Sequence, residues 1–270
     1  MSVATGRHIL DVRGVTKEYP LKNGAVVALQ DINLQVDQGQ VVSVLGPSGC
    51  GKTTLLEVIA GLRPVTRGQV LLQGTAMTGP STKVGIVFQQ DSTLPWRSVL
   101  SNIAFGMEMT GVSRSESARR AKEMLDLVGL TEFADAHPHQ LSGGMRQRVA
   151  VARVLAMEPE LIVMDEPFGA LDEQTRLRLG LELLDLVTRV GTTILLVTHS
   201  IQESALLSDR VVVLSARPGA IRESFDVPIA KPRTLGTLAS TEYARFTHTL
   251  WSCLMEMEGV ESSNVVSVRA

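Results

Sequence analysis

The feature that most constrains this chain is a glycine-rich segment placed between a short apolar run and a helical pattern. The segment is Gly46-Pro-Ser-Gly-Cys-Gly-Lys-Thr53; it follows Val41–Leu45 and opens a helical pattern over Thr53–Gly61. Glycines let backbone N–H groups approach an anion closely, and a helix N-terminus adds partial positive charge. Lys52 can reach the β- and γ-phosphates, and the Thr53 hydroxyl is a hard oxygen ligand suited to Mg²⁺. This strand–loop–helix arrangement is a P-loop, and it predicts binding of a nucleoside triphosphate.

A second strand end supplies two carboxylates. The apolar run Leu161–Met164 leads directly into Asp165 and Glu166. An Asp-Glu pair after a strand is usually a solvated loop end, but the P-loop upstream favours a catalytic interpretation. We expect Asp165 to hold Mg²⁺ through water, and Glu166 to orient or deprotonate the attacking water.

Short runs of β-branched residues recur along the chain, with helical patterns between them. Several runs are apolar throughout, which is typical of strands buried on both faces of a parallel sheet. The alternation predicts an α/β fold with a mostly parallel sheet. The runs are Val41–Leu45, Val84–Phe88, Leu161–Met164, Ile194–Val197 and Val211–Leu214, and the helical patterns are Thr53–Gly61, Arg146–Met157 and Gln174–Val190.

Two other stretches follow different patterns. Ile9–Val12 and Ile32–Val36 alternate between apolar and polar residues, which predicts an antiparallel β subdomain at one edge. Residues 92 to 139 are mostly helical in pattern and, with the helix that follows, predict an α-helical subdomain inserted over about 92–157. We therefore expect one ATPase domain over residues 8–220 and a C-terminal tail over 221–270.

The tail contains a predicted helix over Thr241–Met257, whose apolar residues recur at helical spacing. The apolar residues are Tyr243, Phe246, Leu250, Leu254 and Met257. We expect this stripe to pack on the protein's own core, with a dimer contact or a regulatory element as the alternative.

Composition excludes several classes of protein. The net charge of −2 gives no basic field for nucleic acid, and two cysteines are too few for a secreted disulfide scaffold. No apolar stretch approaches the ~20 residues that a membrane-spanning helix needs. Any role at a membrane is therefore expected to come through a partner.

Five further motifs follow the order of a known family. They are Tyr19 before Pro20, Gln89 after a strand, Leu141-Ser-Gly-Gly-Met145, Gly169-Ala-Leu-Asp172, and His199 after the run Ile194–Val197. Each motif alone has a plainer interpretation: an edge-sheet aromatic, a helix N-cap or a core histidine. Together with the P-loop they make the chain resemble the ATPase subunits of ABC transporters across residues 8–220, with the P-loop NTPase core of that family.

The resemblance implies a site for ATP and Mg²⁺ shared by two copies of the chain. Catalytic roles are implied for Glu166, His199, Gln89 and Lys52, and metal contacts for Thr53, Gln89 and Asp165. Contacts to ATP are implied for Tyr19, Gly46, Pro47, Ser48, Gly49, Cys50, Gly51, Lys52, Thr53, Thr54, Ser142, Gly143 and Gly144. The tyrosine would stack on adenine, and the loop Ser142–Gly144 would close on the γ-phosphate held by the other subunit. Met145 departs from the commonest family residue, glutamine, but the backbone cradle does not depend on that side chain.

Other segments resemble the importer branch that serves nitrate, aliphatic sulfonates and taurine. They include Leu94-Pro-Trp-Arg-Ser-Val99, Met164–Arg176 and Val211–Gly219. The resemblance implies a membrane-spanning permease as partner, a solute-binding protein as indirect partner, no nucleic acid, and a place on the cytoplasmic face of the inner membrane. The apolar cluster Leu94, Pro95 and Trp96 is expected to form the groove that receives a short helix of the permease. The solute cannot be read here, since selectivity belongs to the other subunits.

Three alternatives fit less well. A GTPase would carry an Asn/Thr-Lys-x-Asp motif, which the sequence lacks, and a small-molecule kinase would not need the loop at Ser142. A non-transport ABC ATPase acting in DNA repair or on ribosomes is the main alternative. Such proteins usually carry a long coiled-coil insertion or two cassettes, whereas this chain has one cassette and no heptad tract.

Overall fold

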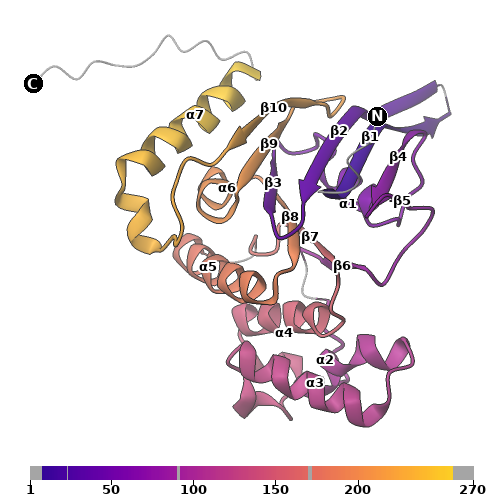
Figure 1. The fold of residues 1–270 in the computed structure, drawn as a ribbon, viewed down its shortest axis with the longest axis vertical. Helices are drawn as coiled ribbons and strands as arrows, with labels where there is room; N and C mark the ends of the chain where they lie inside the picture. Colours follow the sequence, from indigo (N-terminus) through magenta and orange to yellow (C-terminus); the bar gives the residue numbers. More distant parts are fainter. Residues whose placement is uncertain (1–7, 23, 90–91, 170–171, 258–270) are drawn as a thin grey trace, which may run out of the picture.

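A parallel sheet of apolar strands forms the centre of the computed structural model, which describes residues 8–22, 24–89, 92–169 and 172–257 (Figure 1). The strand order is β10-β9-β3-β8-β7-β6, and only β10 is antiparallel to its neighbour. The strands are β3 (Val41–Leu45), β6 (Val84–Val87), β7 (Leu161–Asp165), β8 (Thr193–Thr198), β9 (Arg210–Leu214) and β10 (Ile221–Asp226). All five expected strands are confirmed. β10 was not expected, because it is a largely exposed, polar edge strand; it extends the sheet past residue 220.

An antiparallel sheet lies beside this parallel sheet, as the alternating N-terminal pattern predicted. Its order is β2-β1-β4-β5, formed by β1 (His8–Leu21), β2 (Gly24–Asp37), β4 (Arg67–Leu72) and β5 (Thr75–Ala76). The last two strands were not predicted. β4 begins with three exposed residues, and β5 has only two, so neither has a readable pattern.

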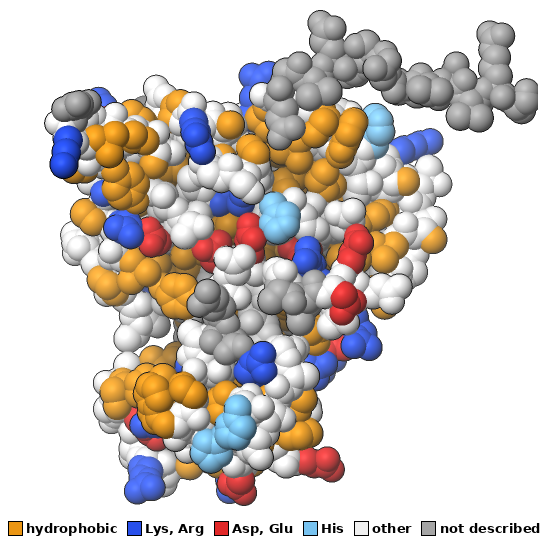
Figure 2. Space-filling model, turned by 180° about the vertical axis from the view of Figure 1, so that it is seen from behind, with side chains coloured by type: hydrophobic (Ala, Val, Ile, Leu, Met, Phe, Trp, Pro, Cys, Tyr) orange, Lys and Arg blue, Asp and Glu red, His pale blue; other side chains and the backbone are white. Residues whose placement is uncertain are grey.

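The inserted segment forms a helical layer below the sheets in Figure 1. It contains α2 (Val99–Met109), α3 (Arg114–Leu127), α4 (Gly143–Leu155) and the short 3₁₀ turns η1 (Thr131–Phe133) and η2 (Pro138–Gln140). Each of these three α-helices begins with a serine cap, whose side chain accepts a backbone N–H from the first turn. The caps are Ser98, Ser113 and Ser142. Hydrophobic side chains reach the surface of the layer (Figure 2), where Trp96 is 72% exposed. The fold class is confirmed.

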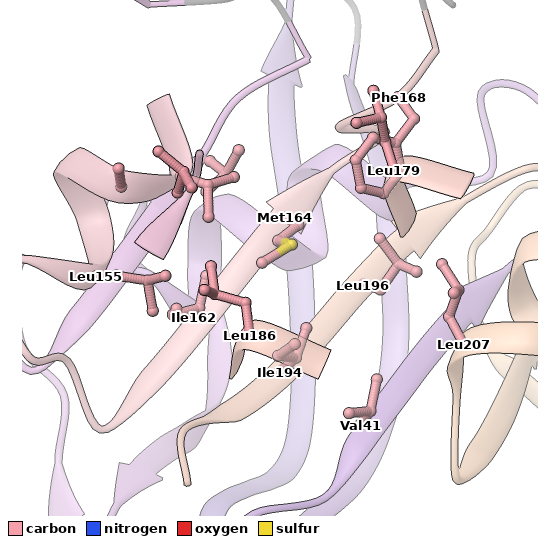
Figure 3. Close-up of a cluster of buried hydrophobic side chains, with 14 of the residues drawn as sticks. Val41, Leu155, Ile162, Met164, Phe168, Leu179, Leu186, Ile194, Leu196 and Leu207 are labelled. Atoms are coloured by element: carbon pink, nitrogen blue, oxygen red, sulfur yellow. The ribbon is translucent and has the colours of Figure 1, made fainter. Parts of the chain in front are cut away.

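Two apolar clusters lie on opposite faces of the parallel sheet. Along β3, Val41 and Leu45 belong to one cluster, and Val42 and Val44 belong to the other. The first cluster includes side chains from β7, β8 and the helices α4, α5 (Glu173–Val190) and α6 (Ile201–Leu207), and Figure 3 shows part of it. The second contains α1 (Lys52–Ile59) and the antiparallel sheet. Because both faces are covered, every residue of β3 and β8 is buried, which explains their continuous apolar runs.

The tail returns along the parallel sheet and ends in a helix. It contains η3 (Leu235–Ala239) and α7 (Thr241–Met257), the latter with the predicted bounds. Tyr243, Phe246 and Leu250 are buried in the first cluster, and Leu254 and Met257 are partly buried against it. The stripe therefore packs on the protein's own core. Among the residues that the structure describes, no helix is both long and apolar enough to cross a membrane.

Candidate active site

The P-loop joins β3 to α1, and its lysine is folded back over it. Lys52 Nζ donates to the carbonyl oxygens of Gly46, at 2.8 Å, and Pro47, at 3.0 Å. Gly51 has a φ of +98°, and a Cβ there would lie 2.8 Å from the Ala28 carbonyl oxygen, so this position requires glycine. Ser48, Gly49 and Thr53 are exposed, whereas Lys52 is only 6% exposed. The loop thus presents its backbone and hydroxyl groups to solvent, and the ammonium group lies beneath them.

Cys50 differs from its neighbours because its side chain lies underneath the loop. The residue is 1% exposed, and its Sγ lies 2.9 Å from where a Cβ on Gly46 would be. Burial raises the pKa of the thiol. Any contact from Cys50 to a phosphate must therefore come from its backbone.

Four predicted site residues lie beyond the carboxyl ends of neighbouring parallel strands. Asp165 ends β7 and Glu166 follows it, His199 follows β8, and Gln89 lies two residues after β6. The Glu166 carboxylate is at the centre: Gln89 Nε2 donates to its Oε2 at 3.3 Å, and His199 Nδ1 lies 3.0 Å from its Oε1. The structure therefore brings together three of the four residues proposed as catalytic.

The backbone of Glu166 is also unusual. Its φ is +43°, in the left-handed region that non-glycine residues rarely occupy. Its N–H donates to the Val197 carbonyl oxygen at 2.8 Å, which fixes the turn against β8. Strained residues of this kind cluster at functional sites, where the surrounding structure holds them in place.

Asp165 lies between the carboxylate of Glu166 and the P-loop. Burial raises the pKa of Asp165, while a hydrogen bond with the Thr53 side chain and the charge of Lys52 oppose that shift. Within the described residues, no group of three or more histidine, cysteine or acidic side chains is arranged to hold a metal ion. The Asp165 carboxylate and the Thr53 hydroxyl are oxygen donors beside the P-loop. They fit Mg²⁺, which usually keeps several waters and binds one or two carboxylates together with substrate phosphates.

Tyr19 lies on β1, where two cations flank its ring. Lys17 Nζ is 5.2 Å and Arg63 Cζ is 5.8 Å from the ring centroid, both within cation–π range. The ring is partly exposed. The two cations were not predicted, because nothing in the spacing of residues 17, 19 and 63 places them together.

Ser142, Gly143 and Gly144 are arranged differently from the rest of the predicted site. The Ser142 hydroxyl accepts the Met145 N–H at 3.3 Å and caps the 13-residue helix α4. Ser142 and Gly143 are exposed. In the described part of the chain, no hydrogen bond or ion pair joins these three residues to the P-loop. This exposed helix N-terminus has the backbone N–H groups and the dipole that can bind an anion.

The predicted motif Gly169-Ala-Leu-Asp172 lies between Glu166 and α5, but Ala170 and Leu171 fall outside the described residues. Gly169 N–H donates to the Glu166 carbonyl oxygen at 3.0 Å. Asp172 accepts the Thr175 N–H at 3.0 Å and so caps α5.

Comparison with known proteins agrees with this geometry. A family model described as ABC transporter matches residues 29–169, more than half of the chain. The chain belongs to the ABC transporter family. The taurine import ATP-binding protein TauB of Roseobacter denitrificans is 45% identical over 222 residues, 82% of this chain and 83% of that protein. The nitrate import ATP-binding protein NrtD of Synechocystis sp. PCC 6803 is 40% identical over 264 residues, 96% and 99% of the two chains.

A solved cassette shows the same fold. The ATP-binding cassette MJ0796, in a dimeric post-hydrolysis structure with ADP and Pi, has a TM-score of 0.71 and 32% sequence identity. The match covers 82% of this chain and 100% of that one. The chain described here is therefore an ABC ATPase that binds ATP.

One buried group in this ABC ATPase has no counterpart among the predicted residues. Glu203 is 2% exposed and lies in the first turn of α6, close behind His199. Its neighbour Arg176 comes from α5. Arg176 ends the segment Met164–Arg176 named in the sequence analysis, but no signal marked Glu203 or the pair, because their contact arises only when the two helices pack.

Proposed function

We propose that this ABC ATPase is the ATP-hydrolysing subunit of an import system and couples hydrolysis to solute movement through a membrane-spanning permease. The observation that carries the proposal is the position of the Glu166 carboxylate. It is held between Gln89 and His199 and follows the strand that ends at Asp165, next to the P-loop. A carboxylate in that position has the chemistry of a general base for water beside a bound γ-phosphate.

Each site residue has a proposed role that its surroundings support. The backbone and side chains of Gly46–Thr54 surround the phosphates, Lys52 neutralises their charge, and Tyr19 stacks on adenine. Thr53, Gln89 and Asp165 supply oxygen ligands for Mg²⁺, which when bound neutralises charge on the phosphates. Glu166 accepts the proton of the attacking water, and His199 contacts the γ-phosphate.

Two copies of the chain would complete the site. The N-terminus of α4, with Ser142, Gly143 and Gly144, is suited to bind a phosphate, yet it makes no polar contact with its own P-loop among the described residues. Supplying this cradle to the P-loop of a second copy gives two composite sites in a homodimer. The dimeric state of the MJ0796 cassette supports this arrangement.

The import role rests on two observations. The TauB and NrtD relatives are import ATP-binding proteins, which favours a taurine-, sulfonate- or nitrate-like solute delivered by a solute-binding protein. In addition, Trp96 is 72% exposed next to α2, where Arg97 anchors the loop by donating to Glu108 at 2.8 Å. This rigid apolar surface suits a helix of the permease, with the ATPase on the cytoplasmic face of the inner membrane. Residues 8–220 would form the ATPase domain with the insertion at 92–157, and 221–270 the tail.

Glu166→Gln tests the proposal by separating ATP binding from hydrolysis. Glutamine keeps the shape of the side chain but cannot accept a proton, so we expect turnover to fall by about 10²–10⁴-fold. ATP and Mg²⁺ should still bind, and unhydrolysed ATP should hold two chains together by linkage. Light scattering after size exclusion should show a monomer without nucleotide or with ADP, and a dimer with ATP.

Glu182→Gln is the matched control, because Glu182 is an exposed carboxylate paired with Arg148 on the surface of the helices. It should hydrolyse ATP normally and should not accumulate as a dimer. Full turnover by Glu166→Gln would remove Glu166 from its role, and a monomer in saturating ATP would contradict the composite site.

A further inference from the structure

An ion pair between the buried Glu203 and the partly buried Arg176 lies between the turn that carries His199 and the segment that carries Glu166. Glu203 Oε1 is 3.5 Å from Arg176 Nε, and the two side chains are 3% and 18% exposed. Burial raises the pKa of Glu203, whereas the hydrogen bond from Thr198 and the charge of Arg176 oppose that rise. Removing a carboxylate from water costs free energy unless it is paired and hydrogen-bonded. The burial of Glu203 therefore calls for an explanation.

The Glu203 side of the pair fixes the turn that carries His199. Thr198 Oγ1 donates to Glu203 Oε2 at 2.5 Å and accepts the Ser200 N–H at 3.0 Å. The Ser200 hydroxyl in turn accepts the Glu203 N–H at 3.2 Å. These three bonds tie the residues on either side of His199 to the first turn of α6. They fix the backbone turn that carries His199, while its half-exposed side chain contacts Glu166.

The Arg176 side of the pair reaches the segment that carries Glu166. Arg176 Nη2 donates to the Gly169 carbonyl oxygen at 3.3 Å, and Gly169 N–H donates to the Glu166 carbonyl oxygen at 3.0 Å. Arg176 thus links the turn after β7 to the turn after β8. The contact of 3.0 Å between His199 and Glu166 spans the same two turns on the solvent side.

We propose that Arg176 and Glu203 are positioning residues that hold His199 against Glu166 for hydrolysis. The inference rests on the proposed roles of His199 and Glu166, and it adds a specific prediction: Glu203 acts on turnover through His199. The contacts described above lead from the pair to the turns after β7 and β8, so we expect kcat to depend on the pair much more strongly than ATP affinity does.

The test is a double-mutant cycle between Glu203→Gln and His199→Ala, with kcat and ATP affinity measured for each variant. Glu203→Gln should lower kcat by about 10-fold or more, because small misplacements of reacting groups have effects of this size. Its ATP affinity should stay within about twofold of that of the unmodified chain. In the His199→Ala background, Glu203→Gln should change kcat by less than about twofold, because the side chain that Glu203 positions is already missing.

The control is Asp185→Asn, which removes a carboxylate paired with an arginine of the same helix, Arg189, at 2.6 Å. That pair is exposed, and its loss should leave kcat and affinity unchanged. Thr198→Val removes the hydroxyl that links the turn to Glu203, and it should lower kcat much more than Thr198→Ser does. This second pair of variants keeps the test valid even if Glu203→Gln unfolds.

Equal reductions in kcat by Glu203→Gln with and without His199 would overturn the inference, as would an equal loss of ATP affinity. If His199→Ala alone keeps full kcat, the proposed role of His199 fails, and the inference fails with it. The two failures are therefore distinguishable.

Discussion

The carboxyl edge of the parallel sheet and the helical layer hold their functional groups in opposite ways. At the sheet edge, Gln89 and His199 both contact Glu166, and Lys52 bonds to its own loop. On the helical layer, Ser142 and Trp96 are exposed, and neither is joined to the sheet edge by a described polar contact. Groups at the edge are assembled by the fold of one chain, whereas those on the layer are the ones for which we propose contacts with another molecule. Mutations in the two regions should therefore fail in different assays.

The largest effect is expected at the sheet edge, from Lys52→Ala. Loss of the charge that contacts the phosphates should reduce turnover by about 10³-fold and weaken ATP binding, since charged contacts to transferring phosphates have effects of this size. The isolated chain should show the defect without any partner. Lys122→Ala, at an exposed position of α3, is the control and should behave normally. Near-normal ATPase activity in folded Lys52→Ala would contradict the assignment of the loop.

An intermediate effect is expected from Ser142→Arg on the helical layer. Added to Glu166→Gln, it should leave ATP binding by each chain intact but weaken the ATP-dependent dimer. Inserting bulk into a packed contact typically costs about 1–3 kcal/mol, or up to about 10²-fold in affinity. Ser142→Ala distinguishes phosphate binding by the loop from helix capping by the serine. It removes only the hydrogen bond from Met145 N–H and adds no bulk, so the dimer should survive. A dimer unaffected by the arginine would show that the second copy does not bind at this loop.

The smallest effect is expected from Trp96→Ala, which should leave both nucleotide assays unchanged. Removing an aromatic anchor from an interface costs about 2 kcal/mol, which corresponds to about 30-fold weaker assembly with the permease. Trp251→Ala is a matched control, because Trp251 is also exposed but lies on α7. Co-purification with the permease would measure the difference. Equal retention of the permease by both variants would assign Trp96 to internal packing of the helical layer.

The same contrast explains how much of the molecule could be predicted from its sequence. Strands β3, β7 and β8 are buried on both faces, so their apolar runs identified them, and the residues following each strand could be expected to meet at one edge. β10 and β4 expose polar residues and therefore gave no clear signal. The tail helix was predictable because one face is buried and the other is not. Cys253 also belongs to the buried face of this helix, although the sequence analysis did not include it in the apolar stripe.

The candidate site also contains some residues that the sequence predicted and others that only the structure revealed. Lys52, Glu166 and His199 lie in motifs with fixed spacing, so a single sequence was enough to find them. Arg176 and Glu203 belong to different helices, and the Lys17 and Arg63 cations around Tyr19 come from β1 and from the segment after α1. Such contacts depend on tertiary packing, which periodicity does not encode.

The strand order has a consequence for folding of the chain during its synthesis on the ribosome. β3, which leads into the P-loop, pairs with β8 and β9, so Val41 finds its partner Ile194 about 150 residues later in the chain. At a synthesis rate of about 5–20 residues per second, the strand waits roughly 8–30 s for that partner. During this interval a strand that is apolar at four of its five positions has neither of its final neighbours, and the helical layer between them is made first. The nucleotide site is thus assembled late, and we expect nascent chains that end before β8 to expose β3 to aggregation.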